Sequence, residues 1–113
     1  MFRNIALVGE GTTKIACINF LNRNSVSKNN LWKRQTTVFY QNIQPTTNLG
    51  LIFFDNFNQH RIENHIKELK HVDADYLIMW PSNQDWLNLN CKKGNIIFLP
   101  KEINWGLILS TLP

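Results

Sequence analysis

Glycine, threonine and lysine follow the first apolar strand of the chain in an order that suggests a phosphate-binding turn. The strand ends at Gly9, and Gly11 and Lys14 come shortly after it. A nucleoside-triphosphatase begins with a strand, a turn of sequence G-x-x-x-x-G-K-[ST] and a helix. Here Thr13 stands in place of the second glycine, Ile15 stands in place of the magnesium-binding hydroxyl, and the turn is one residue short. We interpret the segment as a vestigial phosphate loop.

A second group of candidate residues follows the strongest strand of the chain. Asp55 closes that strand, and ligands of parallel α/β sheets bind at the carboxyl ends of strands. In the D-x-x-G-Q segment of small GTPases, the aspartate helps to hold magnesium and the glutamine orients the attacking water, which would be Asp55 and Gln59 here. Asn58 replaces the glycine that approaches the γ-phosphate, and Pro100–Ile103 lacks the asparagine and aspartate of the guanine-reading N-K-x-D. We therefore expect no catalysis, no nucleotide, no cofactor and no metal.

The same aspartate is compatible with an alternative, a degenerate receiver domain of a response regulator. Asp55, Glu10 and Lys101 would then surround the site at which an aspartate accepts phosphate. The acidic pair expected after the first strand is incomplete, because Gly9 precedes Glu10. A receiver also has a helix between its second and third strands, for which this chain has no room. The direction of these strands separates the two hypotheses, since a receiver makes them parallel.

Hydrophobic periodicity divides the chain into the strands and helices that would position these residues. The expected strands are 4–8, 36–40, 49–54, 76–80 and 96–99. The expected helices are one that starts after Thr12 or Thr13 and ends at 22–24, then 59–71 and 104–112, with one helical turn over 85–90. Thr12 or Thr13 is expected to cap the first helix, and Asn104 the last. Only about eight residues separate the second strand from the third, whereas a parallel crossover needs a dozen or more. We therefore expect an antiparallel hairpin over about 36–54 in an otherwise parallel sheet.

Composition predicts one soluble domain over residues 1–113. The net charge of +4 is mild, and no segment has the character of a signal peptide or a membrane span. Cys17 and Cys91 lack metal-ligand spacing, and we expect Cys17 in a helix core. His60 and His65 are five residues apart instead of the four that place two ligands on one helix face, so no metal site is expected.

Four tryptophans are candidates for the core or for an interface. Trp80 and Trp105 lie in apolar segments, so we expect them in the core. Trp32 and Trp86 lie in connections, where aromatic side chains serve either as core or as interface anchors. Trp32, Trp86 and Ile78 are the candidate partner-binding residues.

The segment Leu49–Ala74 resembles the centromere protein M family, which consists of small-GTPase-like kinetochore subunits that have lost the nucleotide machinery. In that family the first strand ends in L-V-G and an acidic residue, as Leu7–Glu10 does here. A strand of the form D-L-I-V-F then leads into a helix that ends in L-R-H-V-D-A. The corresponding segments here are Gly50–Phe54 and Leu69–Ala74. The resemblance covers about half of the chain, which is much shorter than the family.

The resemblance implies a Ras-like three-layer fold, truncated relative to a full small GTPase, in which the last strand stands for the family's fifth or sixth. It implies a non-catalytic interaction subunit of the constitutive centromere-associated network at the inner kinetochore. The implied partner is the helical-repeat subunit centromere protein I, with the H and K subunits nearby and centromeric DNA in indirect proximity. The implied location is the nucleus, at the centromere, with no membrane or nucleotide among the partners.

Overall fold

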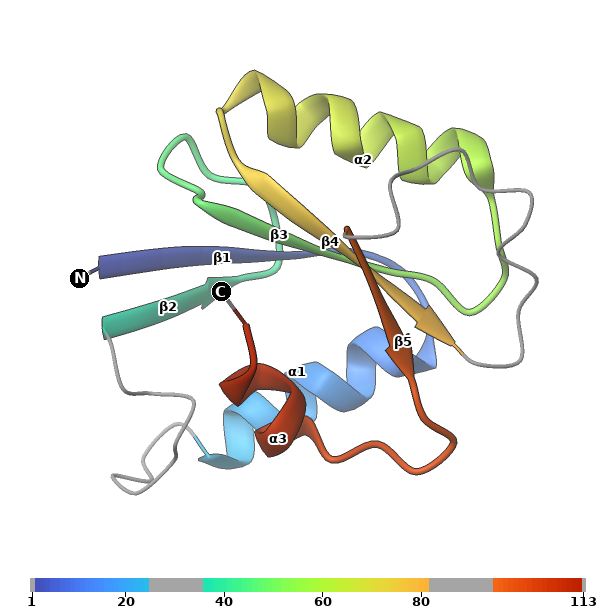
Figure 1. The fold of residues 1–113 in the computed structure, drawn as a ribbon. Helices are drawn as coiled ribbons and strands as arrows, with labels where there is room; N and C mark the ends of the chain where they lie inside the picture. The colour runs from blue at the N-terminus through green and yellow to red at the C-terminus, as the bar shows by residue number, and fades with distance from the viewer. Residues whose placement is uncertain (1, 25–35, 82–94, 113) are drawn as a thin grey trace.

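Five strands with helices on both faces make up the part of the chain that the structure, a computed structural model, describes: residues 2–24, 36–81 and 95–112 (Figure 1). This arrangement confirms the expected three-layer α/β architecture. The elements follow one another as β1 (Phe2–Gly9), α1 (Thr12–Asn24), β2 (Thr36–Tyr40), β3 (Leu49–Phe53), α2 (Gln59–His71), β4 (Asp75–Pro81), β5 (Ile96–Leu99) and α3 (Trp105–Ser110).

All pairings between the described strands are parallel, so the expected antiparallel hairpin over residues 36–54 is wrong. β2 and β3 do not pair with each other, because β1 lies between them and pairs with both. We expected a parallel crossover to need a dozen or more residues. The connection 41–48 has only eight residues and contains no helix, and a fully extended segment of this length spans roughly 26–29 Å. Five-residue strands are only about 17 Å long, so an extended chain can return from the end of β2 to the start of β3.

Hydrogen bonds fix this connection against the start of β1. The Thr47 amide donates to the Gln44 carbonyl at 3.0 Å, and the Gln44 amide donates to Thr47 Oγ1 at 2.8 Å, which closes the turn around Pro45. Asn48 Oδ1 accepts from the Asn4 amide at 2.8 Å, and the Asn48 amide donates to the Asn4 carbonyl at 2.9 Å. The crossover is therefore tied to the strand that it passes before the chain enters β3.

The strand order is β2-β1-β3-β4-β5, which is the order of one common doubly wound sheet. α1 and α3 lie on one face of the sheet, and α2 covers the other (Figure 1). The chain therefore leaves β1 toward one face and leaves the neighbouring strand β3 toward the opposite face. In open parallel sheets, a crevice forms at the carboxyl ends of two such strands and is where ligands bind. The candidate residues after β1 and β3 lie at this edge.

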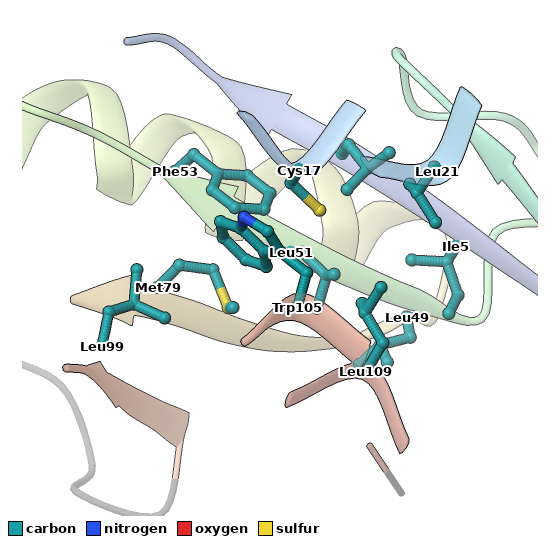
Figure 2. Packing of buried hydrophobic residues seen from close by; sticks show 11 residues of the cluster. Ile5, Cys17, Leu21, Leu49, Leu51, Phe53, Met79, Leu99, Trp105 and Leu109 are labelled. Carbon is teal, nitrogen blue, oxygen red and sulfur yellow. The ribbon is translucent and has the colours of Figure 1, made fainter. Parts of the chain in front are cut away.

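Buried apolar side chains fill the layer between the sheet and helices α1 and α3 (Figure 2). Cys17 and Leu21 of α1 and Trp105 and Leu109 of α3 form one cluster with side chains of the central strands. The rings of Trp105 and Phe53 lie 6.1 Å apart between centroids. The expected core positions of Cys17 and Trp105 are thus confirmed.

The opposite layer packs α2 onto β3 and β4. Leu69 lies over Gly50 so closely that a Cβ atom at Gly50 would lie 2.3 Å from a Leu69 methyl group. Trp80 is fully buried against Phe54, with 5.2 Å between the ring centroids, which confirms its expected place in the core. Ile78 is also fully buried in this layer, so its assignment to a partner-binding surface is wrong. The β-strand alternation turns Ile78 toward α2 instead of toward solvent.

Most element boundaries agree with the sequence pattern to within one or two residues. The prediction of α2 is confirmed at both ends, and Asn58 caps it by accepting from the Arg61 amide at 3.1 Å. Asn104 caps α3 as expected, with the Leu107 amide as donor at 3.1 Å. The expected turn over 85–90, together with Trp32 and Trp86, lies outside the described residues.

Candidate functional site

A tight turn joins β1 to α1 at the carboxyl edge of the sheet. Gly9 and Gly11 have φ angles of 97° and 114°, a conformation that residues with a Cβ atom rarely adopt. The Glu10 amide donates to the Phe53 carbonyl at 3.2 Å, which joins the turn to the end of β3. A Cβ atom at Gly9 would lie 2.0 Å from that carbonyl oxygen. The first glycine is thus required both by the backbone conformation and by the close approach of β3.

The carboxylate of Asp55 lies at the start of α1. Its Oδ2 atom accepts from the amide and the hydroxyl of Thr12 at 2.6 and 2.8 Å. Its Oδ1 atom accepts from the amide and the hydroxyl of Thr13 at 3.3 and 3.1 Å. The amides at a helix N-terminus and the helix dipole form an anion-binding position, which phosphate groups occupy in nucleotide-binding proteins. In this chain a carboxylate from the neighbouring strand occupies that position.

Gly11 makes room for this carboxylate. A Cβ atom at position 11 would lie 2.5 Å from the carboxyl carbon of Asp55 and less than 3 Å from both of its oxygens. The glycine that resembles part of a phosphate loop is therefore matched to an internal anion. We expected Thr12 or Thr13 to cap α1 as the residue before the helix. Instead both belong to its first turn and donate to the side chain of Asp55, which follows β3.

The hydrogen bonds at the start of α1 shift the ionisation of Asp55. Partial burial raises the pKa of the carboxyl group, but the four hydrogen bonds from Thr12 and Thr13 lower it by more. The net effect places the pKa of Asp55 below its ordinary value of 3.8. The group is therefore ionised at neutral pH and bound as an anion.

The two charged residues of the turn also contact protein groups. Lys14 Nζ donates to the carbonyl of Gly9 at 3.1 Å, so its ammonium group lies against the turn itself. Glu10 forms an ion pair with Arg61 on α2, and both side chains are mostly exposed. The lysine that would serve a bound triphosphate and the acid of the receiver alternative thus both contact groups of the protein itself.

A small cavity of about 80 Å³ opens beside the turn, between the ends of β1 and β3 and helix α2. It is lined in part by Phe54, Ile62 and His65. The Nδ1 atom of His65 is buried and has no hydrogen-bond partner among the described residues. Burial lowers the pKa of His65 below its ordinary value of 6.5, and the nearby charge of Glu68 opposes this shift. The ring is therefore mainly neutral at pH 7.

The structure brings Gly9, Gly11, Lys14 and Asp55 together at one edge of the sheet, as the sequence argument expected. Lys101 follows β5, which is separated from β3 by β4 in the sheet. Gln59 donates to Glu63 along α2 at 3.0 Å.

Two features were not predicted from the sequence: the contact of Arg61 with Glu10, and the hydrogen bonds that Thr12 and Thr13 donate to Asp55. The available signal was the Thr-Thr pair after the glycines together with an acid after the next parallel strand. Neighbouring parallel strands end at the same edge of a sheet. Because β1 and β3 are neighbours, Asp55 after β3 lies close to Thr12 and Thr13 after β1.

Comparisons of this chain with protein-family models, with curated proteins and with solved structures give no match. None of the helices that the structure describes combines the length and the apolar character needed to cross a bilayer. Within residues 2–24, 36–81 and 95–112, no three side chains of His, Cys, Asp or Glu gather to hold a metal ion. The geometry at the carboxyl edge of the sheet is therefore the main indication of function.

Proposed function

We propose that this chain is a non-catalytic interaction module whose fold has the layout of a nucleotide-binding domain. The observation that supports this proposal is the carboxylate of Asp55 at the start of α1, where it accepts hydrogen bonds from two backbone amides. A phosphate group would need the same amides and would meet the negative charge of Asp55. Binding a nucleotide would therefore require the chain to give up its own helix cap.

The more specific proposal is that the module serves the inner kinetochore, as a subunit of the constitutive centromere-associated network in the nucleus. It would bind the helical repeat of centromere protein I, with the H and K subunits nearby. The support is the resemblance of Leu49–Ala74, which forms β3, α2 and the turn into β4. That turn is built on Asp73, whose φ angle of 59° ends the helix in a left-handed conformation. β2 and β3 run in the same direction and do not form the hairpin that was expected in a truncated Ras-like fold. The kinetochore assignment is therefore supported by the resemblance of Leu49–Ala74 alone.

Two experiments test the proposal at its two levels. Isothermal titration with guanine nucleotides and magnesium is expected to give no binding heat, and micromolar binding would disprove the non-catalytic assignment. Co-purification with the centromere protein I repeat is expected to give a stable complex. A chain that stays monodisperse and does not bind this repeat would disprove the kinetochore assignment. It would not disprove the assignment as a non-catalytic interaction module. Asp55→Ala and Lys14→Ala are expected to leave partner binding intact, because the proposal gives the former ligand edge no part in partner binding. A large loss of binding by either variant would show that this edge contacts the partner.

A second candidate function is a degenerate receiver domain, which three observations favour. The β2-β1-β3-β4-β5 order and the parallel direction of β2 and β3 are those of receivers, and Asp55 follows β3. Against it, both oxygens of Asp55 accept hydrogen bonds from α1, and the crossover 41–48 lacks a helix. Incubation with acetyl phosphate and magnesium tests this candidate, because a mass gain of one phosphoryl group on Asp55 would favour it over the interaction module.

A further inference from the structure

His65 of α2 faces the turn that joins β1 to α1. It lines the cavity of about 80 Å³ together with Gly9 and Glu10 of that turn and the buried side chains of Phe54 and Ile62. The residue as a whole is partly exposed. Its Nδ1 atom, in contrast, has almost no accessible surface and has no hydrogen-bond partner among the described residues. One ring nitrogen of a titratable group is therefore held away from water at the contact between α2 and the turn.

Protonation of His65 changes what this buried nitrogen requires. A neutral imidazole carries a single hydrogen, so Nδ1 can remain a bare acceptor, whereas an imidazolium carries a hydrogen on each nitrogen. The protonated ring thus turns Nδ1 into a buried donor, for which the described residues offer no acceptor. A buried donor without a partner bears its full desolvation cost, and a positive charge on the ring adds to that cost. The position that suits the neutral ring is therefore unfavourable for the charged one.

Charged groups from α2, from the turn and from α1 face the ring. Glu68 of α2 and Glu10 of the turn favour the imidazolium, and Lys14 of α1 and Arg61 of α2 oppose it. Burial has the largest effect, and the pKa of His65 lies below its ordinary value of 6.5. Because the unfolded chain then binds this proton more tightly than the folded chain, the free energy of unfolding falls as the pH drops from 6.5 through the lower folded value.

We propose that protonation of His65 loosens α2 from the turn that joins β1 to α1. The neutral ring lets the helix pack against the turn, and the charged ring leaves this position for solvent. The ion pair of Glu10 with Arg61 is mostly exposed and contributes too little free energy to hold the helix by itself. This acid-sensitive contact is independent of the proposed function, since it requires neither a nucleotide nor a protein partner.

Hydrogen exchange of the full chain at pH 7 and pH 5, followed by NMR, tests the proposal. Histidine is the side chain whose ordinary pKa lies between these values. Protection factors, which correct for the intrinsic exchange rate at each pH, are compared. We expect those of the α2 amides around His65, and of the Glu10 amide that is bonded to Phe53, to fall by roughly fivefold at pH 5. The Asn48 amide, bonded to Asn4 at the opposite edge of the sheet, is expected to keep its protection.

Variants of the three histidines of α2 show which one is responsible. His65→Phe keeps a ring without a nitrogen, and His65→Gln keeps a polar group that does not titrate; both are expected to have the same α2 protection at the two pH values. His60→Gln and His71→Gln remove exposed histidines at the two ends of the helix and are expected to keep the wild-type loss. A loss that persists in both His65 variants, a loss abolished by His71→Gln, or an equal loss at Asn48 would each overturn the proposal. The spectrum of each variant at pH 7 shows that it is folded.

Discussion

Replacing Asp55 by alanine removes the carboxylate that caps α1 from the neighbouring strand. Four hydrogen bonds from Thr12 and Thr13 are lost, and two of their donors are backbone amides of the first helical turn. Loss of a helix cap costs about 1 kcal/mol, and loss of a negative charge at a helix N-terminus costs about 0.3–1 kcal/mol. We expect Asp55→Ala to lower the free energy of unfolding by about 1–2 kcal/mol at pH 7, which corresponds to roughly 5–10 °C in melting temperature.

Urea unfolding of three variants at several pH values measures this effect. Asp55→Asn keeps one accepting oxygen and is expected to lose about half as much stability as Asp55→Ala. Glu102→Ala removes an exposed carboxylate after β5 and is expected to change stability by less than about 0.5 kcal/mol.

The effect of Asp55→Ala depends on pH in a direction fixed by the lowered pKa of Asp55. The folded chain holds this group as an anion more strongly than the unfolded chain does. Its contribution is therefore fully present well above the ordinary pKa of 3.8 and is lost as the pH falls through the lower folded value. The difference between wild type and Asp55→Ala should shrink below this pH. A difference as small as that of Glu102→Ala, or one that grows on acidification, would refute the reasoning.

Three further predictions concern the same turn and the core beside it. Inorganic phosphate is expected to raise the melting temperature of Asp55→Ala more than that of wild type, since the vacated helix terminus accepts an anion; equal shifts would count against this. Gly11→Ala is expected to lower the free energy of unfolding by about 2 kcal/mol or more, because of the φ of 114° and the contact of the new Cβ atom with the Asp55 carboxylate. The loss should be smaller in the Asp55→Ala background, and equal losses in a double-mutant cycle would argue against this contact. Burial raises the pKa of Cys17 to about 12, so its thiol should resist alkylation at pH 8 until the chain unfolds, and peptide mapping distinguishes it from Cys91.

The elements could be predicted from the sequence because each depends on its own residues. The apolar spacing of α2 predicts that helix, and the continuous apolar run of β3 predicts that strand. Their arrangement depends on contacts distant in the sequence. The direction of β2 relative to β3 is set by the pairing of both strands with β1, and the connection 41–48 permits either direction by length alone.

The sequence predicts which residues form the candidate site, but not which contacts they make. Gly9, Gly11 and Lys14 were identified from a phosphate-loop pattern and Asp55 from its place after the strongest strand, and the structure brings them to one edge. That the carboxylate caps α1 depends on β1 and β3 being neighbours, which no local pattern reveals. The ion pair between Glu10 and Arg61 joins residues 51 positions apart, and surface pairs of this kind have no signature in a single sequence.

An NMR titration of the carboxyl groups between neutral pH and pH 2 tests the central claim most directly. If Asp55 fills the anion position at the start of α1, its pKa lies below 3.8. The amide shifts of Thr12 and Thr13 should then change with that same pKa, because both amides donate to the titrating group. A pKa at or above 3.8, with amides that do not respond, would contradict the claim that this chain holds its own carboxylate where a phosphate would bind.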